Sequence, residues 1–310
     1  MRLVFLGTPA FAVPTLERIV EAEHQVVCVV TQPDRPRGRG QHLAPPPVKA
    51  AALRFGLRVY QPERVRHPEV VEALRALAPE LMVVVGYGQI IPQTVIDLAP
   101  LGIVNVHASL LPKYRGAGPI QWAILNGETR TGVTTMRIDA GLDTGDMLLE
   151  AQTEIDPDEN AVELSQRLAV MGADLLVKTL DGLARGTITL QRQNPDEATH
   201  APLLKKEDGI LEWSQPARAI HNRVRGLQPW PGALTIFRGQ TLHIWRSRPR
   251  PERGPSPGRF LSLKPPVVAC GAGSLELVEV QLEGRKRIPA ADFANGQRLT
   301  DNDSLGASSP

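Results

Sequence analysis

The first 108 residues alternate short apolar runs with amphipathic helical segments, and this alternation limits the possible folds more than any other feature of the chain. The runs are rich in Val, Ile and Leu, which is typical of strands buried on both faces of a helix-covered parallel sheet. The sequence therefore predicts a doubly wound α/β domain. The predicted strands are RLVFLG (2–7), QVVCVVT (25–31), RVYQ (58–61), LMVVVG (81–86) and GIVNVHA (102–108).

The chain has 310 residues, which is more than a single hydrophobic core usually spans, so we expect two domains. We assign residues 1–190 to the α/β domain. The polar stretch 191–208, with two prolines, is predicted to be a linker. Short β-type runs punctuated by Gly and Pro fill residues 209–299 and favour a small OB-like β-barrel. Residues 300–310 are small and polar and are predicted to form a disordered tail.

Several protein classes are disfavoured at once. No apolar run reaches the roughly 18 residues of a membrane span, and the N-terminus lacks the features of a signal peptide, so we expect a cytoplasmic protein without a membrane partner. We also expect a monomer. The two cysteines, Cys28 and Cys270, are too few for a disulfide framework or a Cys-based zinc site. We expect no metal and interpret both cysteines as buried apolar residues.

The charge distribution is uneven. Nine arginines and only one acidic residue lie between Arg218 and Arg259, although the whole chain has a net charge of only +2. A concentrated basic stretch is typical of a protein that binds a polyanion such as nucleic acid. The alternative is a solvated surface in a chain that is rich in arginine, and charge alone leaves both interpretations open.

The fifth predicted strand ends in Asn105 and His107, which are two positions apart and therefore share one face. Ligands of doubly wound sheets bind beyond the carboxyl ends of the strands, which is where this pair lies. An amide and an imidazole side by side can donate hydrogen bonds to an oxygen that gains negative charge during acyl transfer. The alternative is a hydrogen-bonded structural histidine.

A second cluster is the acidic loop DAGLDTGD (139–146). Its carboxylates could orient an imidazole or position a water that moves protons. A calcium loop is disfavoured because the spacing of an EF-hand is absent, whereas an Asx turn remains a structural alternative.

A third cluster is the loop 31–49, which follows the second strand and holds Arg35, Arg37 and Arg39. A basic loop beside the ligand crevice could bind a phosphate backbone, although a plain flexible insertion would have a similar composition. The first loop reads GTPAF, so the G-x-G-x-x-G fingerprint of a nicotinamide dehydrogenase is missing.

Six stretches, taken together and in order, resemble the methionyl-tRNA formyltransferase family over nearly the whole chain. The stretches are GTPAFAVP (7–14), TQPDRPRGRG (31–40), NVHASLLPKYRGAGPIQWAI (105–124), GLDTGD (141–146), RGLQPWPGA (225–233) and NGQRL (295–299). The resemblance implies an enzyme that moves the formyl group of 10-formyltetrahydrofolate, its co-substrate, to the α-amine of methionyl initiator tRNA. It also implies a Rossmann-like catalytic domain followed by an OB-like, tRNA-binding domain.

The resemblance assigns roles residue by residue. The catalytic residues would be Asn105, His107 and Asp143. The family's folate-contacting S-L-L-P motif falls on Ser109, Leu110, Leu111 and Pro112. Its basic loop, which enters the tRNA acceptor stem, falls on Arg35, Arg37 and Arg39. The sequence departs from the family mildly at Ala108, where Gly is frequent, and at Tyr114, where Trp is frequent.

Three alternatives share part of this pattern. A formyltransferase acting on a small-molecule amine or a 10-formyltetrahydrofolate hydrolase would keep the same catalytic residues. A non-catalytic RNA-binding module would keep only the basic surface. The basic second domain and the loop 31–49 favour a tRNA acceptor over a small amine.

Overall fold

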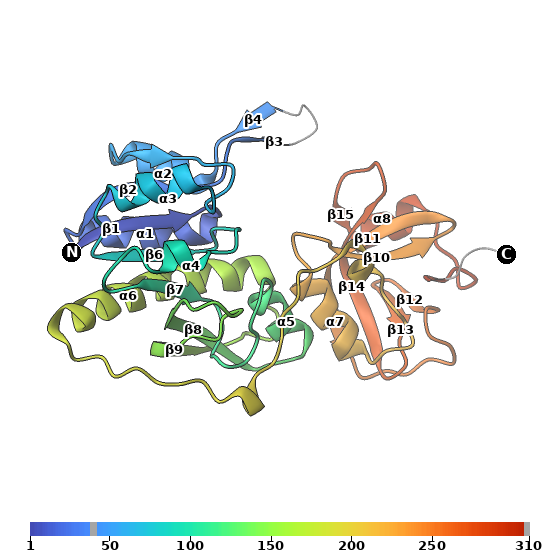
Figure 1. Cartoon of the computed structure of the whole chain (residues 1–310). Coiled ribbons are helices and arrows are strands. Elements are labelled where there is room, and N and C mark those ends of the chain that lie inside the picture. Colours follow the sequence, from blue (N-terminus) through green and yellow to red (C-terminus); the bar gives the residue numbers. More distant parts are fainter. Residues whose placement is uncertain (38–41, 307–310) are drawn as a thin grey trace. The chain divides into compact units, whose positions relative to one another are not determined.

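The computed structural model, shown in Figure 1, describes residues 1–37 and 42–306. The chain divides into two compact units, and each of them is built from three separate stretches. The first unit comprises Met1–Pro119, Arg130–Thr153 and Ser165–Ala201. The second unit comprises Ile120–Thr129, Glu154–Leu164 and Pro202–Pro310.

The first unit is built on a seven-stranded sheet with the order β5-β2-β1-β6-β7-β8-β9. The pairs from β5 to β7 are parallel, and β8 joins β7 in antiparallel fashion. This arrangement confirms the predicted doubly wound, mainly parallel sheet. Its strands are β1 (Arg2–Gly7), β2 (Gln25–Val30), β5 (Val59–Tyr60), β6 (Leu81–Val85), β7 (Ile103–His107), β8 (Arg130–Arg137) and β9 (Met147–Glu154).

Helices lie on both faces of this sheet (Figure 1). Along β1, Val4 and Leu6 belong to a buried cluster that also contains Leu74 of α3 and Val95 of α4. Because side chains alternate along a strand, Leu3 and Phe5 point to the other face, and they are fully buried as well. The helices of this unit are α1 (Val13–Glu21), α2 (Pro47–Arg54), α3 (Pro68–Arg75), α4 (Gln93–Ile96) and most of α6 (Ala161–Arg185). Helix α5 (Pro119–Leu125) belongs to the second unit except for its first residue, although composition places it in the α/β domain.

The loop 31–49 contains an element that the sequence pattern does not reveal. Strands β3 (Arg35–Arg37) and β4 (His42–Ala44) pair in antiparallel fashion as a small separate sheet. Neither RPR nor HLA has the alternation of apolar and polar residues that predicts a strand.

The second unit contains an antiparallel sheet with the order β10-β11-β14-β13-β12, and β15 pairs with β14. The predicted run of short strands is confirmed. The elements are α7 (Ala217–Gly226), β10 (Ala233–Phe237), β11 (Gln240–Arg250), β12 (Phe260–Leu263), β13 (Pro266–Ala269), β14 (Ser274–Leu282), β15 (Ile288–Pro289) and α8 (Ala290–Gly296).

The prediction of a disordered tail is wrong for residues 300–306. The backbone nitrogen of Leu305 donates to Gly258 O at 2.8 Å, next to β12, and that of Gly306 donates to Ile236 O of β10 at 2.9 Å. The segment therefore joins the two edge strands of the sheet, and the Leu305 side chain is buried. The sequence signal is weak because Leu305 is the only large apolar residue among small and polar neighbours.

The segment 191–201 also differs from the linker that composition predicts. Its backbone pairs with Met147 through Gln191 and with Arg115 through Thr199 and Ala201. The short 3₁₀ helix η2 (Pro195–Glu197) lies between these two pairings. Residues 191–201 are therefore an integral part of the first unit, and their polar composition reflects side chains that are mostly exposed on its surface.

Two further features bear on the classes considered above. Among the described residues, no helix combines the length and the apolar character that crossing a membrane requires. Both cysteines are free and buried, as predicted, and burial raises the pKa of Cys270 to about 12.

Candidate active site

Strand β7 brings the two central residues of the candidate site together. Asn105 and His107 are both buried, and their positions in the strand place them on one face of the sheet. Within residues 1–37 and 42–306, the Asn105 side chain has no hydrogen-bond partner. Its amide donors are therefore free to bind a molecule that enters the site.

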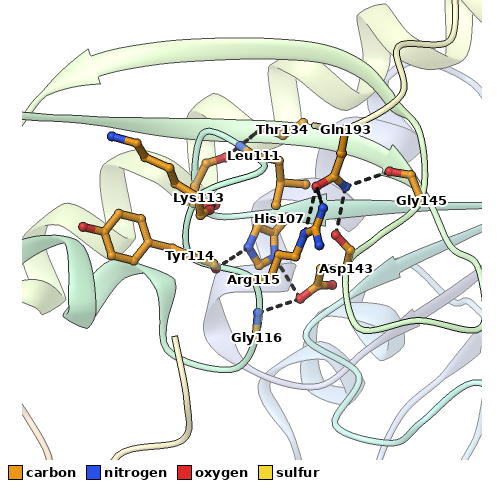
Figure 2. A network of polar contacts seen from close by, with 11 residues as sticks. His107, Leu111, Lys113, Tyr114, Arg115, Gly116, Thr134, Asp143, Gly145 and Gln193 are labelled. Atoms are coloured by element: carbon orange, nitrogen blue, oxygen red, sulfur yellow. Dashed lines mark hydrogen bonds and ion pairs between the residues drawn. The ribbon is translucent and has the colours of Figure 1, made fainter. Parts of the chain in front are cut away.

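His107 is held by the loop that follows its own strand. Its Nε2 lies 2.9 Å from the backbone oxygen of Tyr114. A carbonyl oxygen can only accept, so Nε2 carries the proton and donates it to Tyr114 O. Nδ1 is then the ring atom that can take up or release a proton, and it faces the Asp143 carboxylate (Figure 2).

Asp143 comes from the acidic loop 139–146 between β8 and β9. Its Oδ2 lies 3.7 Å from His107 Nδ1 and accepts a hydrogen bond from the backbone nitrogen of Gly116 at 2.8 Å. The Asp143 backbone is in the left-handed region, with φ of 52°, which is uncommon for a residue other than glycine but tolerated by aspartate. The loop therefore places one carboxylate against both the imidazole and the loop that follows β7.

Gly116 fits this position for steric reasons. Its φ is 120°, and a Cβ atom there would lie 2.7 Å from the backbone oxygen of Ala201. A side chain would therefore push residues 115–116 away from the segment 199–201. The Asp143 carboxylate depends on that backbone position because it accepts from Gly116 N.

The remainder of the acidic loop is held by an Asx turn. Oδ1 of Asp139 accepts from the Gly141 nitrogen at 3.0 Å and from the Thr144 hydroxyl at 2.7 Å. Across residues 1–37 and 42–306, no group of three His, Cys, Asp or Glu residues is arranged to hold a metal ion. The carboxylate of Asp139 thus shapes the loop, and that of Asp143 faces the histidine.

The four residues of the S-L-L-P motif differ in exposure. Ser109 is fully buried, and its hydroxyl donates to the backbone oxygen of Lys113 at 2.6 Å. Leu111 is also buried, whereas Leu110 and Pro112 are half-buried. Within this motif, Leu110 and Pro112 offer most of the surface that a bound molecule could contact.

The three arginines of the loop 31–49 are described to different extents. Arg35 is exposed on β3, Arg37 ends that strand, and Arg39 lies outside the described residues. Below the hairpin, Lys49 Nζ contacts Asp34 Oδ2 at 2.7 Å, and Gln61 donates to Asp34 Oδ1 at 2.8 Å. The hydrogen bonds from Gln61 and Lys49 lower the pKa of Asp34. Both ends of the loop are therefore fixed to each other.

Two residues of the network in Figure 2 could not be assigned to the site from the sequence. Arg115 and Gln193 are both buried, and Arg115 Nε and Nη2 donate to Gln193 Oε1 at 3.0 and 2.8 Å. Gln193 Nε2 donates in turn to the backbone oxygens of Asp143 and Gly145, at 2.8 Å each. Gln193 lies in the segment predicted as a linker, so spacing alone could not have indicated this contact.

Known proteins match both parts of the chain. Residues 1–180 match the family model described as formyl transferase, and residues 203–298 match the model of the formyl transferase C-terminal domain. The two matches cover most of the chain.

Named relatives match the chain from end to end. The methionyl-tRNA formyltransferase of Solibacter usitatus (strain Ellin6076) is 73% identical over 307 residues, which cover 99% of each chain. The methionyl-tRNA formyltransferase of Geotalea daltonii (strain DSM 22248 / JCM 15807 / FRC-32) is 50% identical over 308 residues, covering 99% of this chain and 98% of that protein.

A solved structure shares the fold. The crystal structure of HypX from Aquifex aeolicus in complex with tetrahydrofolic acid has a TM-score of 0.66 and 18% sequence identity. The match covers 95% of this chain and 47% of that chain, so this protein spans about half the length of HypX. At this identity the likeness concerns the fold alone.

Proposed function

The chain belongs to the formyl transferase family, and we propose that it transfers the formyl group of 10-formyltetrahydrofolate to the α-amine of methionyl initiator tRNA. The products are N-formylmethionyl-tRNA and tetrahydrofolate. Identity with named methionyl-tRNA formyltransferases over the whole chain supports the acceptor. The observation that carries the reaction is that the free amide of Asn105 lies on the face of β7 where His107 meets Asp143.

The proposed reaction is direct acyl transfer. The methionyl amine attacks the formyl carbon, a new C–N bond forms, and the bond from that carbon to N10 of the folate breaks. Tetrahydrofolate leaves with a proton on N10, and the attacking nitrogen loses one. Holding both substrates in one crevice provides the orientation on which such a transfer depends.

Asn105 is the proposed donor to the oxygen that becomes negative in the transition state. Its side chain has no partner among the described residues, so binding the oxyanion breaks no hydrogen bond within them. A donor that is fixed before the reaction contributes more than one that must reorganise, and loss of one typically lowers turnover roughly 100- to 1,000-fold.

His107 and Asp143 are proposed to handle the proton. Since Nε2–H is bound to Tyr114 O, Nδ1 is the atom available to accept a proton from the amine, directly or through a water. The Asp143 carboxylate faces Nδ1 at 3.7 Å and stabilises the imidazolium that forms. The same Nδ1–H can then donate to the oxyanion or return the proton to the leaving N10.

The co-substrate is expected to lie against the loop that follows β7. Leu110 and Pro112 are half-buried and available for contact, whereas the buried Ser109 and Leu111 hold the loop in shape. A free amide donor and half-buried apolar side chains suit a formyl oxygen and a flat ring system. We assign direct folate contact to Leu110 and Pro112, and a shaping role to the other two residues.

The tRNA is proposed to contact the basic loop 31–49 and the arginine-rich second unit. Phosphate contacts position a nucleic acid without reading its sequence, and arginines suit them well. Arg35, Arg37 and Arg39 lie between Asp34 and Lys49, whose ion pair fixes the base of the loop. An aminoacyl-tRNA acceptor also supports a cytoplasmic location.

The test compares three acceptors with the same purified protein and 10-formyltetrahydrofolate: methionyl initiator tRNA, methionyl elongator tRNA and free methionine. We expect rapid formylation of the initiator tRNA and little formylation of the other two. Formate release at the same rate without any acceptor would identify a hydrolase and contradict the proposal. Efficient formylation of free methionine would point to a small-amine transferase instead.

A further inference from the structure

Gln193 lies where two loops of the candidate site meet. Its side-chain amide is buried, with 5% of the residue exposed. Nε2 donates to the backbone oxygens of Asp143 and Gly145, and an amide nitrogen has only these two donors. Both donors are thus used on the loop that carries Asp143.

The other end of the same amide holds the loop that follows β7. Oε1 of Gln193 accepts from Nε and Nη2 of Arg115. Arg115 immediately precedes Gly116, whose backbone nitrogen donates to Asp143 Oδ2, and follows Tyr114, whose oxygen accepts from His107. One side chain therefore ties the acidic loop to the loop that fixes the histidine (Figure 2).

The position of Asp143 depends on these contacts in two ways. Its backbone is in the left-handed region, which is unfavourable for most L-residues unless the surroundings hold it. Its carbonyl is bound by Gln193, and its carboxylate is bound by Gly116, the neighbour of Arg115. Loss of the Gln193 amide would free the Asp143 carbonyl. It would also free Arg115, and so weaken the position of Gly116, which binds the Asp143 carboxylate.

We propose that Gln193 is a positioning residue for formyl transfer, which sets the Asp143 carboxylate against His107 by clamping the Asp143 and Gly145 carbonyls to Arg115. The inference rests on the proposed function and adds a residue from the segment 191–201 to the reaction. Gln193 acts only through Asp143 and Arg115. A displacement of about 1 Å at a reacting group can cost on the order of 100-fold in rate.

Glutamine is suited to this place because it both donates and accepts. In Gln193→Glu, a carboxylate would keep the hydrogen bonds to the Arg115 guanidinium but would present an oxygen to two carbonyl oxygens. In Gln193→Met, both sets of bonds are lost in a side chain of similar length. The two variants therefore separate release of the acidic loop from release of Arg115.

The experiment measures kcat and KM for formylation of methionyl initiator tRNA in wild type, Gln193→Met, Gln193→Glu and the control Gln191→Met. Gln191 is exposed, and its bonds to Met147 are made by its backbone. We expect kcat to fall about 10- to 100-fold in both Gln193 variants, with KM for either substrate changed less than about threefold. The control is expected to keep the kcat of wild type.

A double-mutant cycle with Asp143→Asn tests whether Gln193 acts through the carboxylate. We expect Gln193→Met to change kcat less than about twofold once Asp143 is already Asn. The same fold-loss in both backgrounds would overturn the inference, because it would indicate a general structural role. Loss of the thermal unfolding transition in both Gln193 variants would overturn it for the same reason.

Failure of the proposed function is a separate outcome. If the wild-type chain does not formylate methionyl-tRNA, the proposed function is contradicted, and the positioning role that rests on it is overturned with it. If wild type is active and both Gln193 variants match it, only the positioning role is overturned.

Discussion

Oδ2 of Asp143 lies 3.7 Å from Nδ1 of His107, although 36 positions of the chain separate the two residues. The distance is slightly longer than a hydrogen bond, and catalytic contacts often shorten when substrate binds. The other ring nitrogen of His107 donates to the Tyr114 backbone, so the ring cannot turn freely. The Asp143 carboxylate therefore faces Nδ1, as the proposed proton transfer requires.

Asn105→Ala is expected to lower kcat roughly 100- to 1,000-fold, because it removes the proposed donor to the oxyanion. Affinity for methionyl-tRNA, measured by filter binding, is expected to stay within about threefold of wild type. Asn302→Ala, at an exposed asparagine of the second unit, is the matched control. Turnover near that of wild type in Asn105→Ala would exclude the assigned role.

Asp143→Asn keeps the shape of the side chain but removes the charge that is proposed to stabilise the imidazolium. We expect kcat to fall about 100-fold or more, since the proton must leave the amine without this support. His107→Ala is expected to have a similar effect, and the double variant is expected to be little worse than either single one. Glu150→Gln, at an exposed position of β9, is the control. Additive losses in the double variant would indicate two independent roles.

Arg35→Ala and Arg39→Ala test the basic loop. Each is expected to weaken tRNA binding. Each is also expected to reduce the slope of log affinity against log salt by about one, which corresponds to the loss of one phosphate contact. Turnover at saturating tRNA is expected to fall much less than affinity. Arg185→Ala, at the exposed end of α6, is the control of equal charge. An unchanged salt slope in both loop variants would argue against phosphate contacts.

Leu305→Ala tests whether residues 304–306 stabilise the second unit by joining the edge strands β10 and β12. The side chain is buried among the edge strands, so its truncation is expected to cost about 2–5 kcal/mol in the free energy of unfolding. Leu203→Ala makes the same change at a leucine that is 73% exposed and is expected to cost less than about 0.5 kcal/mol. Urea unfolding measures the free energy of unfolding of both variants. Equal values would contradict a stabilising role of Leu305 between the edge strands.

His221 predicts a loss of stability in mild acid. Nε2 donates to Pro157 O, Nδ1 accepts from the Ser247 hydroxyl, and burial lowers the pKa of the ring below its usual 6.5. Asp158 lies 3.7 Å away, but it is mostly exposed, so its opposing effect is screened by solvent.

As the pH falls, the His221 imidazole is therefore protonated at a higher pH in the unfolded state than in the folded state. The free energy of unfolding decreases below about pH 6.5 for this reason. We expect His221→Gln to make the free energy of unfolding less dependent on pH between 7.5 and 5.5. His200→Gln, at an exposed histidine, is the control. Parallel curves for wild type and His221→Gln would contradict the assignment.

Much of the first unit could be predicted because its strands are continuous apolar runs, and a run such as 81–85 is buried along its whole length. Asn105 and His107 could be located because strand polarity alone places them at a ligand edge. The hairpin of β3 and β4 could not be predicted, since its residues lack alternating apolar character. Leu305 was missed because a single apolar residue gives no periodic signal.

Gln193 illustrates a different limit of sequence reasoning. Its partners Arg115 and Asp143 lie 78 and 50 positions away, and the contact depends on how three loops meet. The polar composition of residues 191–201 suggests solvent exposure, which holds for most of them but not for Gln193, and the backbone is paired near both ends of the segment. A buried polar side chain of this kind becomes visible only when tertiary contacts are known.

The most direct test of the central claim follows the formyl group itself. Purified protein in excess over methionyl initiator tRNA is mixed with 10-formyltetrahydrofolate carrying a ¹³C-labelled formyl carbon, and the products of a single turnover are identified by mass spectrometry. We predict that the label appears on the methionyl α-amine of wild type and that Asn105→Ala slows its appearance roughly 100- to 1,000-fold. Label found only in free formate, or transfer at the wild-type rate in Asn105→Ala, would contradict the account.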